Sequence, residues 1–178
     1  GVVTYDSNGT AITTGSATRG QQHYGNYLYA DTVKWVNEGW IDYILPQTYW
    51  ALEHGACPFA DLITWWDKVV KNKKTNLYAS LGLYMKTQGG SGSWATSDLE
   101  GFNQTMLVNS LSNVRGISVY NYLSLLSSVN NKDSFEKMDE LWSKPAVLPV
   151  IRTQEYVKLD KVNDLKIESN VNGYKLSW

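Results

Sequence analysis

The sequence predicts an α/β protein in which parallel strands alternate with helices. Strands of nearly continuous apolar character are expected at residues 40–45, 76–84 and 114–120. Segments with apolar residues at helical spacing separate these strands, and such alternation is typical of βαβ units with a parallel sheet. The strand starts recur at roughly 36–38 residues, which indicates three units within residues 26–144. Such units form either a small open sheet or part of an eight-unit barrel, for which ~250 residues are typical.

The first two helices and the first strand are predicted from apolar spacing and end residues. A helix is expected over residues 27–38, with Gly39 as its C-cap. The buried strand after it stops at Pro46. The second helix covers residues 58–70 and ends before a group of lysines, which suit the negative end of the helix dipole.

The third and fourth helices are predicted from their first turns. Ser97 and Glu100 have the spacing of a capping box. The inner face of that helix is expected to be Leu99, Phe102, Met106 and Leu111. A last helix begins near Asp133. Its inner face is expected to be Phe135, Met138, Leu141 and Trp142.

The two ends of the chain have a different character from its centre. Residues 1–25 are rich in Gly, Ser, Thr and Asn and predict a long loop. Residues 145–149 resemble a linker, and Asn172-Gly173 lies between two β-like runs, as in a hairpin. Two strands alone are only marginally stable, so the tail predicts the first strands of a β domain. We therefore place a domain boundary between 1–144 and 145–178.

Composition excludes several classes of function. The formal net charge is −1 with no basic stripe, so nucleic-acid binding is not expected. No apolar run approaches the ~20 residues of a membrane span. Cys57 is the sole cysteine, and His23 and His54 are the only histidines, so neither a disulfide framework nor a metal site is expected. The glycine-rich run 88–93 lacks the lysine of a phosphate loop, and no cofactor is expected.

Candidate binding residues follow the predicted strands, because ligands of parallel α/β sheets bind beyond the carboxyl ends of the strands. Gln47, Tyr49 and Trp50 follow the first strand, Tyr84 ends the second, and Asn121 follows the third. Aromatic faces stack on the C–H faces of sugars, while amide and phenol groups bind hydroxyls. This set predicts a carbohydrate subsite. The alternative is that the aromatic residues only cap the sheet as part of the core.

Glu53 is the one carboxylate placed shortly after a strand end and beside an imidazole, that of His54. It is a candidate general acid or base, and the alternative is a solvated loop residue. Glycoside hydrolysis ordinarily needs two carboxyl groups about the scissile bond. No convincing pair is found at the predicted strand ends, so a sugar-cleaving protein of this type would need an acid pair elsewhere.

Residues 27–50, which end in Ile-Leu-Pro-Gln-Thr-Tyr-Trp50, closely resemble the glycosyl hydrolase-like 10 family of bacterial cell-envelope proteins. Trp65-Trp66 and the strands at 77–84 and 116–120 fit the same pattern, so the resemblance covers roughly residues 1–142. The residues Tyr120-Asn-Tyr122 depart from it, because a smaller and more polar segment is expected there.

The resemblance implies the C-terminal part of a (β/α)8 TIM barrel, with about three βα units and a short β-rich tail. It implies a parent glycoside hydrolase acting on a bacterial cell-wall or related polysaccharide, outside the cell or in its envelope. The family's acidic motif would lie upstream, so this chain alone is expected to be inactive. Gln47, Tyr49 and Trp50 carry over as sugar-contacting residues. The tail from about 148 resembles the start of a fibronectin type III module.

Three alternatives remain open at this stage. The chain could be a non-catalytic carbohydrate-binding module, a structural domain of the envelope, or a self-contained α/β enzyme that uses Glu53 and His54. An incomplete barrel would also leave strand edges unpaired, so self-association through those edges is a further expectation.

Overall fold

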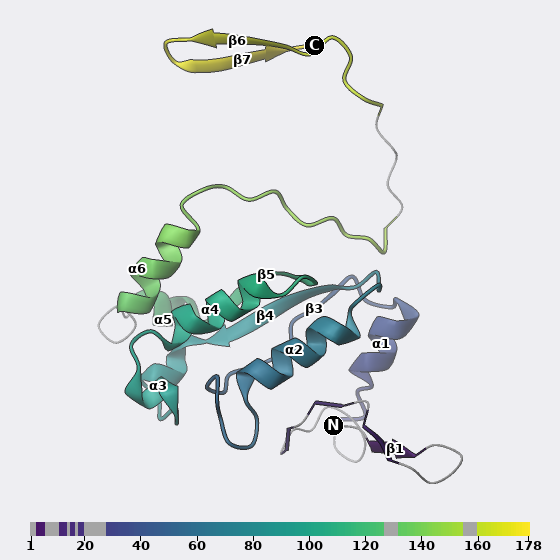
Figure 1. The fold of residues 1–178 in the computed structure, drawn as a ribbon, viewed down its shortest axis with the longest axis vertical. Helices are drawn as coiled ribbons and strands as arrows, with labels where there is room; N and C mark the ends of the chain where they lie inside the picture. Colours follow the sequence, from purple (N-terminus) through teal and green to yellow (C-terminus); the bar gives the residue numbers. More distant parts are fainter. Residues whose placement is uncertain are drawn as a thin grey trace.

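The computed structural model describes residues 3–5, 11–13, 15–16, 18–19, 28–126, 132–154 and 160–178. Its centre is a parallel sheet of strands β3 (Tyr43–Ile44), β4 (Asn76–Gly82) and β5 (Val114–Tyr120), with β4 in the middle (Figure 1). The parallel α/β arrangement predicted from the sequence is therefore confirmed. Three parallel strands joined through helices are consistent with part of a βα barrel.

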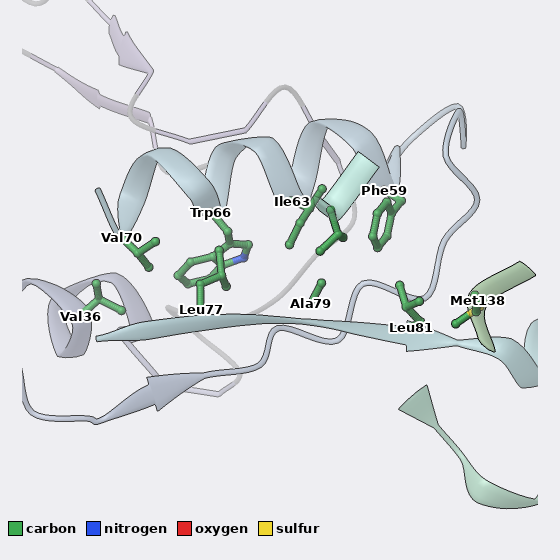
Figure 2. Close-up of a cluster of buried hydrophobic side chains, with 10 residues drawn as sticks. Val36, Phe59, Ile63, Trp66, Val70, Leu77, Ala79, Leu81 and Met138 are labelled. Atoms are coloured by element: carbon green, nitrogen blue, oxygen red, sulfur yellow. The ribbon is translucent and has the colours of Figure 1, made fainter. Parts of the chain in front are cut away.

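Four helices contribute to a core on one face of the sheet. They are α1 (Thr32–Glu38), α2 (Phe59–Val69), α4 (Glu100–Ser110) and α6 (Lys132–Leu141). Figure 2 shows Ile63 and Trp66 of α2 directed toward β4, which contributes Leu77, Ala79 and Leu81 to the core. Because side chains alternate along a strand, Tyr78, Ser80 and Gly82 face the other side of the sheet. Ser80 and Gly82 on that second face contact Tyr49 of the candidate site described below.

Two predicted elements are shorter than the sequence indicated. Helix α1 begins at Thr32, because the Asp31 carboxylate accepts a hydrogen bond from the Lys34 N–H (3.0 Å) and caps the helix there. Leu28, which lies within the predicted helix over residues 27–38, precedes α1 and is 61% exposed. Gly39 ends the helix in the left-handed conformation, as predicted. Strand β3 has only two residues, and Trp40, expected within a buried strand, is 62% exposed.

The prediction for α4 is wrong at its start and at Met106, while Phe102 and Leu111 pack against the core as predicted. Glu100 does not cap the helix, because its side chain is buried and accepts hydrogen bonds from Leu52 and Gln104. Met106, expected inside, is 45% exposed. The buried residues of α4 are mainly small or polar: Glu100, Gly101, Gln104, Thr105 and Val108. Apolar spacing could not predict this face, because Glu100 and Gln104 contact backbone groups of residues 50–52.

Short helices lie just beyond the ends of β4 and β5. The strand expected over 76–84 ends at Gly82, and the 3-10 helix η1 (Leu83–Lys86) follows it. Helix α3 (Ser93–Thr96) comes after the glycine-rich loop, and α5 (Tyr122–Leu126) comes directly after β5. Met138 of α6 is buried as predicted. Leu141 and Trp142 are 43% and 44% exposed, so that part of the predicted inner face is wrong.

Two antiparallel hairpins lie outside the central sheet. Strands β1 (Val3–Tyr5) and β2 (Ala11–Thr13) pair within the segment for which only a loop was predicted. Strands β6 (Lys166–Asn170) and β7 (Gly173–Ser177) form the hairpin predicted for the tail. Before that hairpin, the chain contacts the amino end of β4, where the buried Asn76 amide donates to the Val150 carbonyl (2.8 Å).

Candidate functional site

Three tyrosines meet at the carboxyl ends of the strands, and we refer to Tyr49, Tyr84 and Tyr120 as the tyrosine cluster. The ring centroids of all three pairs are 5.7 Å apart. Tyr49 and Tyr120 are stacked at 24°, while Tyr84 is nearly perpendicular to both, at 87° and 79°. These are favourable aromatic geometries. Tyr120 is 53% exposed, so the cluster reaches the surface.

Tyr49 is positioned through β4. Gln47 forms an isolated parallel bridge with Ser80, and the buried Thr48 hydroxyl donates to the Ser80 carbonyl (3.0 Å). The Ser80 hydroxyl in turn lies 3.4 Å from the Tyr49 phenol oxygen, to which it donates. These contacts extend the short strand β3 as far as the cluster, although regular pairing ends at Ile44.

The environment of Tyr84 favours its neutral form. Burial raises the pKa of the Tyr84 phenol above its ordinary value, and the neighbouring Tyr49 and Tyr120 raise the pKa further. The phenol therefore keeps its proton at neutral pH. It can donate a hydrogen bond to a ligand oxygen as well as accept one.

The backbone that carries Tyr49 and Trp50 is held by three buried side chains. The Trp94 indole N–H donates to the Tyr49 carbonyl (3.1 Å), and the Gln104 amide donates to the Trp50 carbonyl (3.0 Å). The Glu100 carboxylate accepts the Leu52 N–H (2.8 Å). Every one of these three side chains is at most 1% exposed. The segment that ends the first strand is therefore anchored to α3 and α4.

Glu53 and His54 both have partners within the protein. The exposed Glu53 carboxylate accepts the Ser93 N–H (3.0 Å) and the Ser93 hydroxyl (2.9 Å). The His54 Nδ1 atom accepts the backbone N–H groups of Ala56 (3.3 Å) and Cys57 (3.1 Å). Glu53 thus fastens the glycine-rich loop to the first strand end, while His54 organises its own turn.

The remaining predicted residues have distinct positions. Gln47 is exposed at the strand end, and Trp50 is half-buried beside Tyr49. Asn121 follows Tyr120 directly, and its side-chain oxygen accepts the Ser124 N–H (3.1 Å) and the Ser124 hydroxyl (3.2 Å). Asn121 therefore caps α5, which begins one residue later. Of the residues predicted to bind sugar, the structure brings Tyr49 and Tyr84 into direct ring contact.

Tyr120, Glu100 and Gln104 were missed by the sequence reasoning. Tyr120 ends β5, so the rule that selected Tyr84 also applied to it, but the choice fell on Asn121 instead. Glu100 fitted a capping box, and nothing local distinguishes a carboxylate that caps its own helix from one that holds a distant loop. The contacts of Glu100 with Leu52 and of Gln104 with Trp50 join residues 48 and 54 positions apart in the sequence. Such long-range pairs cannot be predicted without the fold.

Neither a metal site nor a membrane-spanning helix is present among the described residues. No group of three or more His, Cys, Asp or Glu side chains in that part of the chain is arranged to hold a metal ion. No helix there has both the length and the apolar character needed to cross a bilayer.

Comparison with known proteins finds similarity to glycosyl hydrolase-like proteins. Residues 10–89 match the family Glycosyl hydrolase-like 10, which confirms the resemblance inferred from the sequence. The matched segment contains α1, β3, α2 and β4, together with Tyr49 and Tyr84 of the tyrosine cluster.

Two relatives extend this result. The chain is 33% identical over 162 residues to the glycosyl hydrolase YngK of Bacillus subtilis, a match that covers 90% of this chain and 31% of the relative. It is 44% identical over 70 residues to the glycosyl hydrolase DigH of Escherichia coli K12, covering 39% of this chain and 16% of the relative. The chain therefore spans about a third or less of the length of these relatives.

Proposed function

We propose that this chain forms the aromatic sugar-binding wall of a glycoside hydrolase that acts on a bacterial cell-wall or related polysaccharide. The sheet and its helices would be the C-terminal units of a (β/α)8 barrel in the cell envelope or outside the cell. The β6–β7 hairpin would belong to a separate fibronectin type III-like module. Relatives named glycosyl hydrolases support the hydrolase class.

The observation that carries the proposal is the tyrosine cluster at the carboxyl ends of three adjacent parallel strands. Enzymes built on such strands bind their substrates at this edge. Tyr120 offers an exposed ring for stacking, and Tyr84 offers a protonated phenol for a sugar hydroxyl. Gln47 and Trp50 flank Tyr49 on the same segment, which adds an amide and a second large ring.

Catalysis would require two further carboxylates, ~5–5.5 Å apart for retention and ~6.5–9.5 Å for inversion. Three carboxylates of the described part of the chain lie near the strand ends, and all three have protein partners. Glu53 holds Ser93, Asp98 pairs with Lys86 at 2.8 Å, and Glu100 is buried. We therefore assign the acid pair to a part of the parent protein outside these 178 residues. Within these 178 residues, Glu53 remains the candidate catalytic residue.

The test is hydrolysis of purified peptidoglycan glycan strands by this chain and by a form extended upstream by ~150 residues, the missing share of a ~250-residue barrel. We expect only the longer form to release reducing ends. Cleavage by this chain alone would contradict the assignment of the acid pair and make Glu53 the leading catalytic residue. No cleavage by either form would contradict the proposed substrate.

A second candidate is a non-catalytic carbohydrate-binding domain, which the engagement of Glu53 and Glu100 in structural contacts favours. It shares the aromatic surface, so it also predicts quenching of tryptophan fluorescence by glycan strands. Trp50→Ala should abolish that quenching, while Trp178→Ala, which removes a 79% exposed ring from the hairpin region, should preserve it. Binding by the longer form without any hydrolysis would decide for this candidate.

A further inference from the structure

Helix α4 carries two buried polar side chains that contact the strand-end segment rather than their own helix ends. One oxygen of the Glu100 carboxylate accepts the N–H of Leu52 and the side-chain amide of Gln104, each at 2.8 Å. The same Gln104 amide nitrogen also donates to the Trp50 carbonyl at 3.0 Å. Glu100 and Gln104 are 1% and 0% exposed. A continuous hydrogen-bonded path thus joins α4 to both sides of Ala51.

Burying Glu100 and Gln104 on a helix face is energetically unfavourable. A buried carboxylate is strongly disfavoured without a charged partner, and its hydrogen bonds here come from neutral N–H groups. The second oxygen of Glu100 and the side-chain oxygen of Gln104 are also buried without a hydrogen-bond partner in the described part of the chain. Apolar side chains would pack this face at lower cost. Polar groups retained at such a cost are typical of functional sites.

We propose that Glu100 and Gln104 are positioning residues that fix Trp50 in the orientation required for stacking on a sugar ring. The inference rests on the proposed carbohydrate function of the tyrosine cluster. Gln104 holds the backbone on the carbonyl side of Trp50, and Glu100 holds it two residues later at Leu52. With both ends of this short stretch fixed, the Trp50 ring loses little conformational freedom when a ligand binds.

The fold provides a matched control for this inference. Asp67 of α2 is also a helix carboxylate that accepts a loop backbone N–H, that of Asn113 at 2.8 Å, as well as the Asn113 amide at 3.1 Å. Asn113 directly precedes β5, so this contact lies at the amino end of the sheet. Loss of the Asp67 contact should therefore lower stability without touching the tyrosine cluster.

The experiment compares Gln104→Leu, Glu100→Leu, Glu100→Gln and the control Asp67→Leu, which removes the acceptor for Asn113, in the full chain. Three quantities are measured: affinity for soluble peptidoglycan glycan strands by tryptophan fluorescence, hydrogen exchange of residues 49–54, and the melting temperature. We expect Gln104→Leu and Glu100→Leu to weaken binding about tenfold and to accelerate exchange in that segment. Glu100→Gln keeps an acceptor for the Leu52 N–H, so its affinity should stay within about threefold of that of the unmodified chain. Asp67→Leu should lower only the melting temperature.

Several results would overturn the inference. Unchanged affinity and exchange in both leucine variants would show that the pair only fills the helix face. An equal loss of affinity in Asp67→Leu would assign the effect to general stability. If Glu100→Leu does not fold, Gln104→Leu provides the same comparison. Failure of the unmodified chain to bind glycan would overturn the proposed function and the sugar-directed part of the inference, and the exchange rates would then decide the positioning part separately.

Discussion

The ring of Tyr49 lies directly over Gly82. A Cβ atom placed on Gly82 would be 2.8 Å from both the Cβ and the Cγ atoms of Tyr49, closer than real Cβ contacts. Gly82 ends β4, and the hydrogen at its Cα leaves the room that the Tyr49 ring occupies. The tyrosine cluster therefore depends on a glycine at this strand end, since any larger residue would displace Tyr49 from its neighbours.

Gly82→Ala should destabilise the protein and disturb the cluster. The added methyl group meets the rigid base of a ring rather than a flexible tip, and overpacking of this kind costs about 1–3 kcal/mol. Urea unfolding should report this loss, and near-ultraviolet circular dichroism should report altered tyrosine packing. Gly55→Ala is the control, because nothing lies within 4 Å of its new Cβ. Equal stability of the two variants would contradict the close approach described above.

Alkaline pH should destabilise the fold through Tyr84. Its pKa is raised in the folded state by burial and by the neighbouring tyrosines, whereas the unfolded chain has an ordinary phenol with a pKa of about 10. The unfolded state therefore loses this proton first as pH rises. The stability contribution is intact below about pH 10 and disappears as pH rises through the folded-state value.

Tyr84→Phe should flatten this alkaline decline, because a phenylalanine has no proton to lose. The measurement is the free energy of unfolding in urea between about pH 8 and 11. Tyr174→Phe, which removes a 78% exposed phenol from the hairpin, should keep the Tyr84-dependent decline. An identical pH profile for Tyr84→Phe and the unmodified chain would contradict the raised pKa.

Glu53→Gln should loosen the glycine-rich loop without unfolding the sheet. The carboxylate accepts two hydrogen bonds from Ser93, and exposed contacts of this kind contribute roughly 0.5–1 kcal/mol. Faster hydrogen exchange at residues 92–94 should accompany a small loss of stability. Glu38→Gln, an exposed change at the end of α1, is the control. If a longer, active form of the protein keeps its turnover with Glu53→Gln, this supports a role of Glu53 in holding the glycine-rich loop and not in acid-base catalysis.

Cys57 should react slowly with thiol reagents. Its side chain is 2% exposed, its thiol donates to the Arg19 carbonyl, and burial raises its pKa so that little thiolate forms. We expect labelling in buffer to be at least about tenfold slower than in urea. Cys57→Ser provides the blank. Equal rates in buffer and urea would contradict the buried position.

Much of the fold could be predicted from the sequence because periodicity and end residues are local properties. The run from Asn76 to Gly82 is apolar enough for a central strand, and Gly39 ends α1 as its position predicted. Helix α1 and strand β3 were predicted too long, because the apolar residues Leu28 and Trp40 were included in them. Both side chains are exposed, and an exposed apolar residue does not mark a buried element.

The candidate site likewise contains residues that the sequence predicted and residues that only the structure revealed. Tyr49, Trp50 and Tyr84 could be selected from the sequence alone, since the edge where ligands bind follows from the order of strands and helices. Only the tertiary structure added Tyr120 to the cluster, assigned Asn121 to a helix cap, and revealed that Glu53 holds a loop. These roles depend on which groups meet across long stretches of chain.

The sequence by itself determined the α/β class, the order of the strands and helices, and the aromatic character of the candidate site. The tertiary structure decided what each polar group does there. Glu100 shows the physical reason most clearly, because a carboxylate at the start of a helix has the same local sequence whether it caps that helix or turns inward. Its partner, the Leu52 N–H, lies 48 residues away, and only folding brings the two together.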